Sequence, residues 1–559
     1  MRALLLLLLA ALAVVPPSAS AQPLSAESLS ALDYRPLMLT GPDLAPLLAA
    51  ASDAATPEAL RAYAYVGGAW QLIPVQTLER VRTDLAFAYP AEVRQRSDLD
   101  PDAIDDLLLY ADPSLLIGAD PDPRIDEDDQ VLLLPSTFGL EAPNGSVPAG
   151  VEAADLVRVR VADPLGGVDR VAYLALAPDA PPVPDAGVRY DYRPDSDTYD
   201  YIGTNPEQSV VTTPYYERHF RDRWIEDRFH VRLDPADPYS PDLLDRRRMG
   251  FEPTSCARTE KTASESRGAP VANVCGPVAC LRSVVGFNSG PLTQLTYLFF
   301  PRYTETRIDL RVHPVPGVSF WRDWAPITQG ATYVSNLFPD GVPLDGQPDA
   351  VEGSLDWDAL LFAQGSVVSS WRVDANVPQW DPEAIWLDEE NPELTPCTGD
   401  EAYYGASGSF VRTTVAVSTD PRDPGYRLLG STSRTAVAPR LNAAEAAALG
   451  EALGTELDVS VDANAVDAEQ DRPASAALDV ALYPNPTAGT TTLRLTLDRA
   501  QDVTVRVFDV LGREVARTDA ALGAGTQTLT LPTDALAPGT YAVRLDAADG
   551  VATKRLSVI

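Results

Sequence analysis

Short runs in which apolar and polar residues alternate fill the first third of the chain. In residues 157–161 three valines alternate with two arginines, the period of two that is typical of a β-strand with one buried face. Residues 61–76 contain two such runs around Gly67-Gly68, a pair typical of a two-residue hairpin turn. These patterns predict a β-sandwich over residues 22–180.

The strand-like character continues over residues 185–440, after the proline-rich segment 177–187, which we expect to be a stiff linker or an extended edge. The segment LNAAEAAALGEALG then favours a short helix, and small and acidic residues follow it, so residues 441–477 are expected to form a helical and acidic linker. Alternation returns in residues 478–559 and predicts a small sandwich. The predicted fold is mainly β, with two β-sandwich regions followed by a small C-terminal immunoglobulin-like β-sandwich.

The N-terminus has the three parts of a secretory signal peptide. Arg2 precedes an apolar run from Ala3 to Val15, and small residues follow before Gln22. The apolar run is too short for a membrane-spanning helix. We therefore expect residues 1–21 to be removed and the mature protein to lie outside the cytoplasm.

The formal net charge is −36, and almost every cation is an arginine. Such a chain repels nucleic acid, whose binding requires a basic surface, so no nucleic-acid partner is expected. We interpret the charge as an adaptation of the surface, with an acidic cation-binding function as the alternative.

The chain has four cysteines, and the expected location outside the cytoplasm decides how they are interpreted. An even number in an oxidising compartment favours two disulfides, for which three pairings exist. We expect Cys275 to pair with Cys280, and Cys256 with Cys397. A zinc site is the alternative, although the spacings fit no zinc pattern.

The last region carries four motifs in order: LYPNPTAG, VRVFDVLGREV, LAPGTYAVRL and a final ATKRLSVI. Together they resemble the C-terminal sorting domain of type IX secretion cargo, a family of bacteria of the Bacteroidetes and their relatives. The resemblance covers residues 478–559. It implies the type IX secretion machinery as a partner, passage across the outer membrane, and a body that is attached to the outer cell surface or released. A plain immunoglobulin-like accessory domain is the alternative.

Prolines and glycines are the residues of this tail with the clearest physical role. Proline cannot donate a hydrogen bond to a neighbouring strand, and glycine supplies the backbone conformations of tight turns. The predicted sorting-motif residues are Pro484, Asn485, Pro486, Gly489, Gly512 and Gly539.

Aspartates crowd the segment DPDPRIDEDDQ, which precedes an apolar run. The aspartates are Asp120, Asp122, Asp126, Asp128 and Asp129. Calcium takes about six to eight oxygen ligands, which such a segment can supply. The spacing differs from the helix–loop–helix calcium loop, because the glycine and the closing glutamate are missing. We expect a solvated loop, with a calcium site as the alternative and no other cofactor.

A row of polar side chains is predicted in the strand TRIDLRVHPV. Arg307, Asp309, Arg311 and His313 alternate with apolar residues and share one face. Such a row can bind an acidic sugar or begin a proton abstraction. More often it is the solvent face of a sheet with cross-strand ion pairs.

Three further side chains are candidate ligand contacts. Trp224 lies in an aromatic and charged segment and can stack on a sugar ring, although a core contact is the more frequent role. Arg282 and Asn288 lie in CGPVACLRSVVGFNSG, which faintly resembles segments of large β-sandwiches in carbohydrate-active proteins.

No nucleophile elbow or glycine-rich phosphate loop occurs, and the three histidines, His219, His230 and His313, fit no metal-ligand spacing. We therefore expect a secreted or cell-surface protein whose body is a non-catalytic binding or surface module, with a glycan as the candidate ligand. The alternatives are a polysaccharide-active lyase or glycosidase on a large β-sandwich, and a structural component of the envelope. A glycosidase is diagnosed by the distance between two carboxylates, which the sequence does not give.

Overall fold

The computed structural model divides the chain into two compact units, one ending at Asp467 and the other beginning at Ala468. The larger unit is described over residues 29–51, 55–83, 107–115, 117–194, 206–222, 226–251, 269–285, 294–311, 317–375, 382–390, 403–412 and 428–463. The smaller unit is described over residues 480–483, 487, 490–497, 499–508, 514–533, 536, 539–547 and 550–558. The predicted signal peptide lies outside these residues. So do the candidate residues Trp224, Cys256, Asn288, His313 and Cys397, and the sorting-motif residues Pro484, Asn485, Pro486, Gly489 and Gly512.

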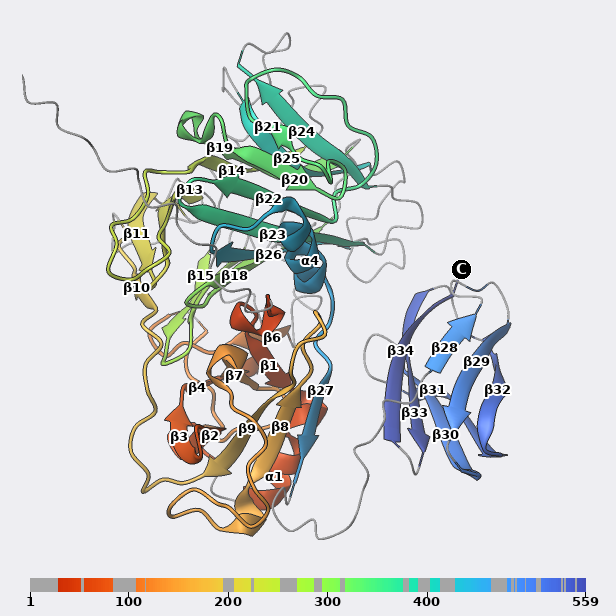
Figure 1. Cartoon of the computed structure of the whole chain (residues 1–559). Helices are drawn as coiled ribbons and strands as arrows, with labels where there is room; N and C mark the ends of the chain where they lie inside the picture. Colours follow the sequence, from red (N-terminus) through yellow and green to blue (C-terminus); the bar gives the residue numbers. More distant parts are fainter. Residues whose placement is uncertain are drawn as a thin grey trace, which may run out of the picture. The chain divides into compact units, whose positions relative to one another are not determined.

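The first part of the larger unit is a sandwich of antiparallel sheets (Figure 1). One sheet has the order β27-β8-β9-β2-β3 and the other β1-β7-β4, and apolar side chains of both fill one core. A short pair, β5-β6, adjoins them. The bounds are β1 (Leu37–Thr40), β2 (Leu60–Val66), β3 (Ala69–Ile73), β4 (Val75–Leu78), β5 (Arg80–Thr83), β6 (Leu107–Tyr110), β7 (Gln130–Leu133), β8 (Val157–Val161), β9 (Arg170–Leu176) and β27 (Val459–Asp462).

Local sequence patterns explain these strands. The three valines of β8 are buried and its two arginines are half-buried, as the alternation predicts. The hairpin between β2 and β3 turns at Gly67 and Gly68, whose φ angles of 60° and 86° are those that a two-residue turn requires. Short helical segments precede or connect the strands: η1 (Ala31–Asp33), η2 (Gly41–Leu44), α1 (Ala45–Ala51), η5 (Pro135–Thr137) and η6 (Ala153–Asp155).

The second part is built on a nine-stranded sheet of order β15-β16-β17-β18-β26-β23-β22-β20-β21. Its bounds are β15 (Ala269–Cys275), β16 (Cys280–Val285), β17 (Gln294–Phe299), β18 (Tyr303–Arg311), β20 (Thr332–Ser335), β21 (Val342–Pro343), β22 (Trp357–Phe362), β23 (Gly365–Ala375) and β26 (Leu428–Ala438). Cys275 and Cys280 form a disulfide between β15 and β16, which confirms this predicted pair.

Two four-stranded sheets share a core with one face of the nine-stranded sheet. The first has the order β10-β11-β12-β13 and the second β14-β19-β25-β24. Their bounds are β10 (Arg189–Asp191), β11 (Pro206–Thr212), β12 (Tyr216–Asp222), β13 (Glu226–Val231), β14 (Leu244–Phe251), β19 (Gly317–Trp324), β24 (Pro382–Glu389) and β25 (Tyr403–Arg412), and η7 (Pro326–Thr328) follows β19. The aromatic and charged segment that contains Trp224 forms, where it is described, the paired antiparallel strands β12 and β13.

The other face of the nine-stranded sheet contacts both helix α4 (Ala443–Gly454) and the first sandwich. Leu449 and Leu453 of α4 pack there, together with Leu109 and Leu132 of the first sandwich. The two body regions therefore share one apolar core.

The segment predicted as a linker is partly integrated into this unit. Asn442 caps α4 by accepting a hydrogen bond from the Glu445 amide, so the predicted helix is present. Strand β27 then pairs with β8 of the first sheet (Figure 1). The chain thus returns to its first sandwich before the unit ends. No helix in the described residues is long and apolar enough to cross a membrane.

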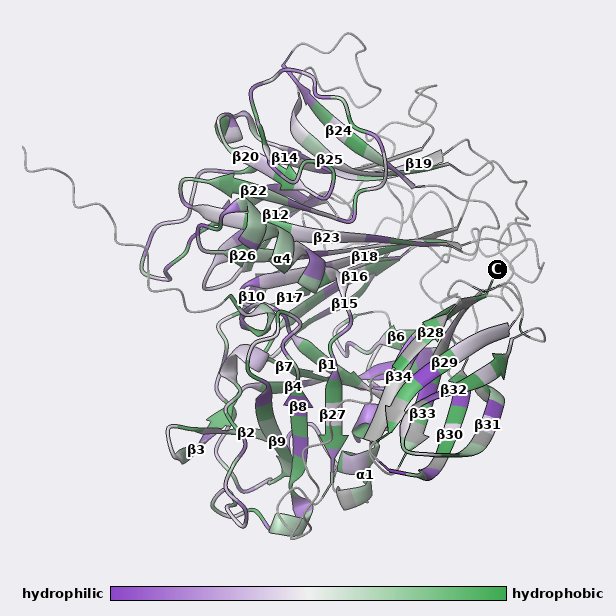
Figure 2. Ribbon diagram, turned by 45° about the vertical axis from the view of Figure 1, so that its right-hand side comes forward, coloured by the Kyte–Doolittle hydropathy of each residue, from purple (hydrophilic) through white to green (hydrophobic). Residues whose placement is uncertain are grey.

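The smaller unit, which we call the tail module, is a two-sheet sandwich. One sheet has the order β28-β29-β32 and the other β31-β30-β33-β34. Hydrophobic and hydrophilic positions alternate along its strands (Figure 2), and the apolar set is buried between the sheets. The bounds are β28 (Val480–Tyr483), β29 (Thr490–Leu497), β30 (Gln501–Phe508), β31 (Glu514–Leu522), β32 (Gly525–Pro532), β33 (Gly539–Ala547) and β34 (Gly550–Val558). The predicted mainly β fold with a small terminal sandwich is confirmed.

Candidate functional site

Five acidic side chains lie close together: one from the junction between β4 and β5, and four from the loop before β7. Ligand oxygens of Glu79, Asp120 and Asp129 lie within 4.8 Å of one another, and so do those of Asp126, Asp128 and Asp129. Asp129 belongs to both groups. We call these five residues the carboxylate cluster.

Backbone amides position the aspartates of the cluster. Asp129 is fully buried and accepts hydrogen bonds from the Arg80 amide at 2.9 Å and the Asp126 amide at 3.0 Å. The Asp128 amide donates to Asp126 Oδ1 at 2.9 Å. The pairing of β4 with β7 brings Glu79 beside this loop, although about forty residues separate them. The carboxylates are therefore fixed by the backbone of two distant segments.

Glu79 is the unusual member of the cluster. Both of its carboxylate oxygens are buried, and neither has a hydrogen-bond partner in the part of the chain that the structure describes. One oxygen of Asp128 is in the same situation. An unpartnered buried carboxylate costs free energy unless a proton or a cation compensates for it.

The pKa values of the cluster also show that its negative charges are poorly compensated. Burial, followed by the charges of Asp129, Asp120 and Asp126, raises the pKa of Glu79 to about 8. Burial is also the main cause that raises the pKa of Asp129 and of Asp128 to about 6. The cluster is thus poorly adapted to carrying its full negative charge alone.

A hard divalent cation is the ligand that this donor set suits best. The cluster offers only oxygen donors from several carboxylates, which is the coordination that calcium prefers. Of the predicted calcium candidates, Asp120, Asp126, Asp128 and Asp129 take part, but Asp122 does not. Asp122 instead forms an exposed pair with Arg124 at 2.6 Å, and this hydrogen-bonded partner lowers the pKa of Asp122 to about 2.

Sequence reasoning missed Glu79, because it lies far from the aspartate-rich segment. A local signal did exist, since Glu79 directly follows β4, a strand whose residues are mostly buried. Its partner segment is set by strand pairing, which the sequence does not give.

The predicted polar row lies on β18. Arg307 is 63% exposed at its side chain and forms an ion pair with Asp309 at 2.9 Å. Ile308 between them is buried, as the alternation predicts. Arg311 ends the strand, and His313 lies outside the described residues. Where it is described, the row is an ion pair on a solvent-exposed face.

Arg282 has a different environment from the one that a ligand contact requires. Its side chain is 1% exposed and forms an ion pair with Glu207, which is buried as well. Its guanidinium also contacts the Tyr190 hydroxyl and lies 4.5 Å from the Phe220 ring centroid. Burial with a carboxylate, a hydroxyl and an aromatic ring is typical of a structural arginine.

The hairpin of β12 and β13 brings together a second set of metal-ligand types that the sequence spacing did not reveal. Atoms of Glu217, His219 and His230 lie within 4.8 Å of one another. His219 Nε2 is already hydrogen-bonded to Glu217 Oε1 at 2.7 Å, and His230 Nδ1 to the Ser240 carbonyl at 2.9 Å. Metal binding here would have to break the first of these bonds, so the set ranks below the carboxylate cluster.

Comparison with protein families identifies the tail module. Residues 481–559 match the model of the secretion system C-terminal sorting domain, and the body matches no family. The resemblance of the four tail motifs is thereby confirmed. A sorting domain of this kind implies an interaction with the type IX secretion machinery, export, and either attachment at the cell surface or secretion. No curated protein sequence matches the chain.

Three solved structures show distant likenesses to this chain. The Slr1438 protein from Synechocystis sp. PCC 6803 has 7% identity and a TM-score of 0.23, with 43% of this chain and 99% of that chain covered. A β-glucuronidase from Parabacteroides merdae has 12% identity and a TM-score of 0.13, with 34% and 28% covered. Latent PorU from Porphyromonas gingivalis has 11% identity and a TM-score of 0.16, with 69% and 35% covered. Likenesses this weak carry no conclusion about the body.

Proposed function

We propose that this chain, whose residues 481–559 are a type IX sorting domain, acts outside the cell as a non-catalytic binding or surface module stabilised by calcium. Residues 1–21 would direct it across the inner membrane, and the tail module would direct it across the outer membrane. The body, which ends at Asp467, would remain on the outer surface or be released.

The positions of the candidate ligand residues support a non-catalytic body. Arg307 and Asp309 neutralise each other on an exposed strand face. Arg282 and Glu207 do so inside the core. Side chains committed to ion pairs are poorly placed to abstract a proton, which is the role that a lyase would require of them.

The observation that supports calcium is Glu79, whose two buried carboxylate oxygens have no described hydrogen-bond partner and face other carboxylates. A divalent cation at this point would supply the missing compensation. It would also link the β4–β5 junction to the loop before β7. Extracellular modules typically bind calcium with dissociation constants of about 10⁻⁴–10⁻³ M, which suits the expected location.

Thermal unfolding of the full chain in calcium or in a chelator tests the cation. We expect calcium to raise the unfolding temperature of the wild type by about 2–4 °C or more. The variant Glu79→Gln should lose this response. Glu127→Gln is the matched control, because Glu127 is an exposed residue of the same loop and should respond like the wild type. An unresponsive wild type, or a Glu79→Gln variant that responds equally, would refute the calcium site.

A separate experiment tests the non-catalytic role. Purified full chain is incubated with anionic and neutral glycans, and both binding and product formation are measured. We expect binding without turnover. Release of reducing ends or unsaturated ends would overturn the proposal in favour of a glycosidase or a lyase, whatever the calcium experiment gives.

A further inference from the structure

The nine-stranded sheet and the two four-stranded sheets that share its core form what we call the larger sandwich. Three arginines meet at a small cavity between these sheets. Arg218 comes from β12, Arg247 from β14 and Arg322 from β19. The polar lining also includes Glu226, the indole of Trp324 and Thr435. The volume within which the centre of a water-sized sphere can lie is about 10 Å³. One small particle is therefore the most that it can hold.

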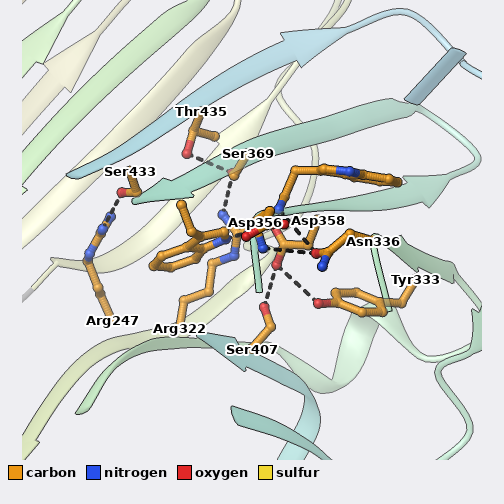
Figure 3. A network of polar contacts seen from close by, with 12 residues as sticks. Arg247, Arg322, Tyr333, Asn336, Asp356, Asp358, Ser369, Ser407, Ser433 and Thr435 are labelled. Carbon is orange, nitrogen blue, oxygen red and sulfur yellow. Dashed lines mark hydrogen bonds and ion pairs between the residues drawn. The ribbon is translucent and has the colours of Figure 1, made fainter. Parts of the chain in front are cut away.

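The arginines outnumber the carboxylates at this cavity. Arg218 forms a buried ion pair with Glu226, and Arg322 forms one with Asp358. The hydrogen bonds of Arg247 go instead to two neutral hydroxyls, Ser433 Oγ at 2.6 Å and Thr306 Oγ1 at 3.4 Å. Figure 3 shows Arg247 beside Arg322, with Ser433 and Thr435 nearby. Three cations and two anions leave one positive charge in excess.

Strand register makes this excess unfavourable. Arg247 of β14 is the direct cross-strand partner of Arg322 of β19. Like charges directly opposite each other destabilise a sheet. Burial is the main cause that lowers the pKa of Arg247; the charges of Arg218 and Arg322 lower it further, and those of Tyr297 and Glu226 oppose this shift. Glu226, the one carboxylate in the described lining of the cavity, is already paired with Arg218.

Hydrogen-bond donors at the cavity also lack acceptors. The Nε1 group of Trp324, which is 1% exposed, has no partner among the described residues, and neither do the Nε groups of Arg218 and Arg322. One acceptor, Glu226 Oε2, is likewise unpartnered. Among the described residues that line the cavity, unpartnered donors thus outnumber unpartnered acceptors by three to one.

We propose that this cavity binds one small monovalent anion, with chloride as the ion of suitable size. A halide only accepts hydrogen bonds, so it can satisfy the Trp324 and arginine donors at once. Its single charge equals the excess contributed by Arg247. A polyatomic anion such as sulfate is too large for the cavity and carries too much charge. The ion would join strands of three sheets and stabilise their packing.

Thermal unfolding of the full chain in sodium chloride and in sodium gluconate, at matched ionic strength, tests the proposal. We expect chloride to raise the unfolding temperature by about 2–4 °C with saturation, and gluconate to raise it less. Arg247→Met should abolish the difference between the salts. Arg372→Met is the control, because Arg372 is an arginine of a surface ion pair and its loss should leave the chloride response intact. Equal responses of the wild type to both salts would overturn the proposal.

A second measurement does not depend on a folded variant. Crystals of the wild-type chain grown in bromide should show an anomalous scattering peak within contact distance of Arg247 and Trp324. A water molecule at that position, with no anomalous signal, would refute the anion site even if Arg247→Met fails to fold.

Discussion

Arg322 of β19 and Asp358 of β22 form an ion pair that links two sheets of the larger sandwich, with both side chains buried. The other hydrogen bonds of Asp358 come from Trp371 Nε1 at 3.1 Å, Ser407 Oγ at 2.6 Å and the Tyr333 hydroxyl at 3.3 Å (Figure 3). The carboxylate is therefore saturated with donors. A buried ion pair satisfied in this way tolerates its desolvation, but the loss of one partner leaves the other uncompensated.

Asp358→Asn should therefore destabilise the body strongly. We expect the free energy of unfolding to fall by about 3–5 kcal/mol, because the buried Arg322 charge loses its counterion. Asp356→Asn is the matched control: Asp356 is two residues away and exposed, and its loss should cost less than about 0.5 kcal/mol. Urea unfolding of both variants measures the difference. Equal effects would contradict the buried pair.

The carboxylate cluster predicts an unusual pH dependence in the presence of a chelator. Burial and neighbouring carboxylates raise the pKa of Glu79 to about 8 from an ordinary 4.5. Between these values the folded chain holds a proton that the unfolded chain has lost. The contribution to stability is therefore fully present below about pH 4.5 and is lost as the pH rises through about 8.

The wild type should consequently lose stability between about pH 5 and 8 more steeply than Glu79→Gln, which lacks the titrating group. At about pH 8 without calcium, Glu79→Gln should unfold at a higher temperature than the wild type, since one buried charge is gone. Thermal melts of both proteins across this range give the comparison. Parallel pH profiles would show that Glu79 is ordinarily ionised in the fold.

What the sequence could predict was local. The valines of β8, the glycine pair after β2 and the helix before Thr455 follow from spacings within a few residues, and each is present in the structure. The tail module was likewise identified from short motifs in order. Such features need no knowledge of which strands pair.

What the sequence could not predict depends on pairing between distant segments. Glu79 joins the aspartate loop only through the pairing of β4 with β7, and Arg247 faces Arg322 only through that of β14 with β19. The register of a sheet is set by the whole hydrophobic pattern and not by any one segment. The spacing of residues along the chain therefore predicted the carboxylate cluster only in part, and it gave no indication of the buried arginines.

The return of β27 to the first sheet predicts where the tail can be removed without damage. Val459 and Val461 pack on the core of the first sandwich, and Asp462 pairs with Arg158 at 2.9 Å. A chain ending at Asp467 keeps these contacts, whereas a chain ending at Thr455 loses them. We expect the shorter chain to lose about 2–4 kcal/mol, mainly from exposed apolar area. Equal urea unfolding curves for the two chains would show that β27 is dispensable.

Helix α4 offers a test of packing in which two similar substitutions should act in opposite directions. A Cβ atom on Gly450 would lie 2.8 Å from ring atoms of Trp357, a buried residue of β22. A Cβ atom on Gly454 would meet Ser370 Cβ at an ordinary 3.7 Å. The helix therefore approaches the sheet most closely at Gly450.

Gly450→Ala should destabilise the body by about 1–3 kcal/mol, because overpacking outweighs the gain in helix propensity. Gly454→Ala should be neutral or stabilise it by up to about 1 kcal/mol, since the propensity gain meets no clash. Urea unfolding monitored by tryptophan fluorescence distinguishes the two, and circular dichroism checks that the helix persists. Stabilisation by both substitutions would mean that α4 does not pack on Trp357, and that the shared core of the two body regions lacks its helical layer.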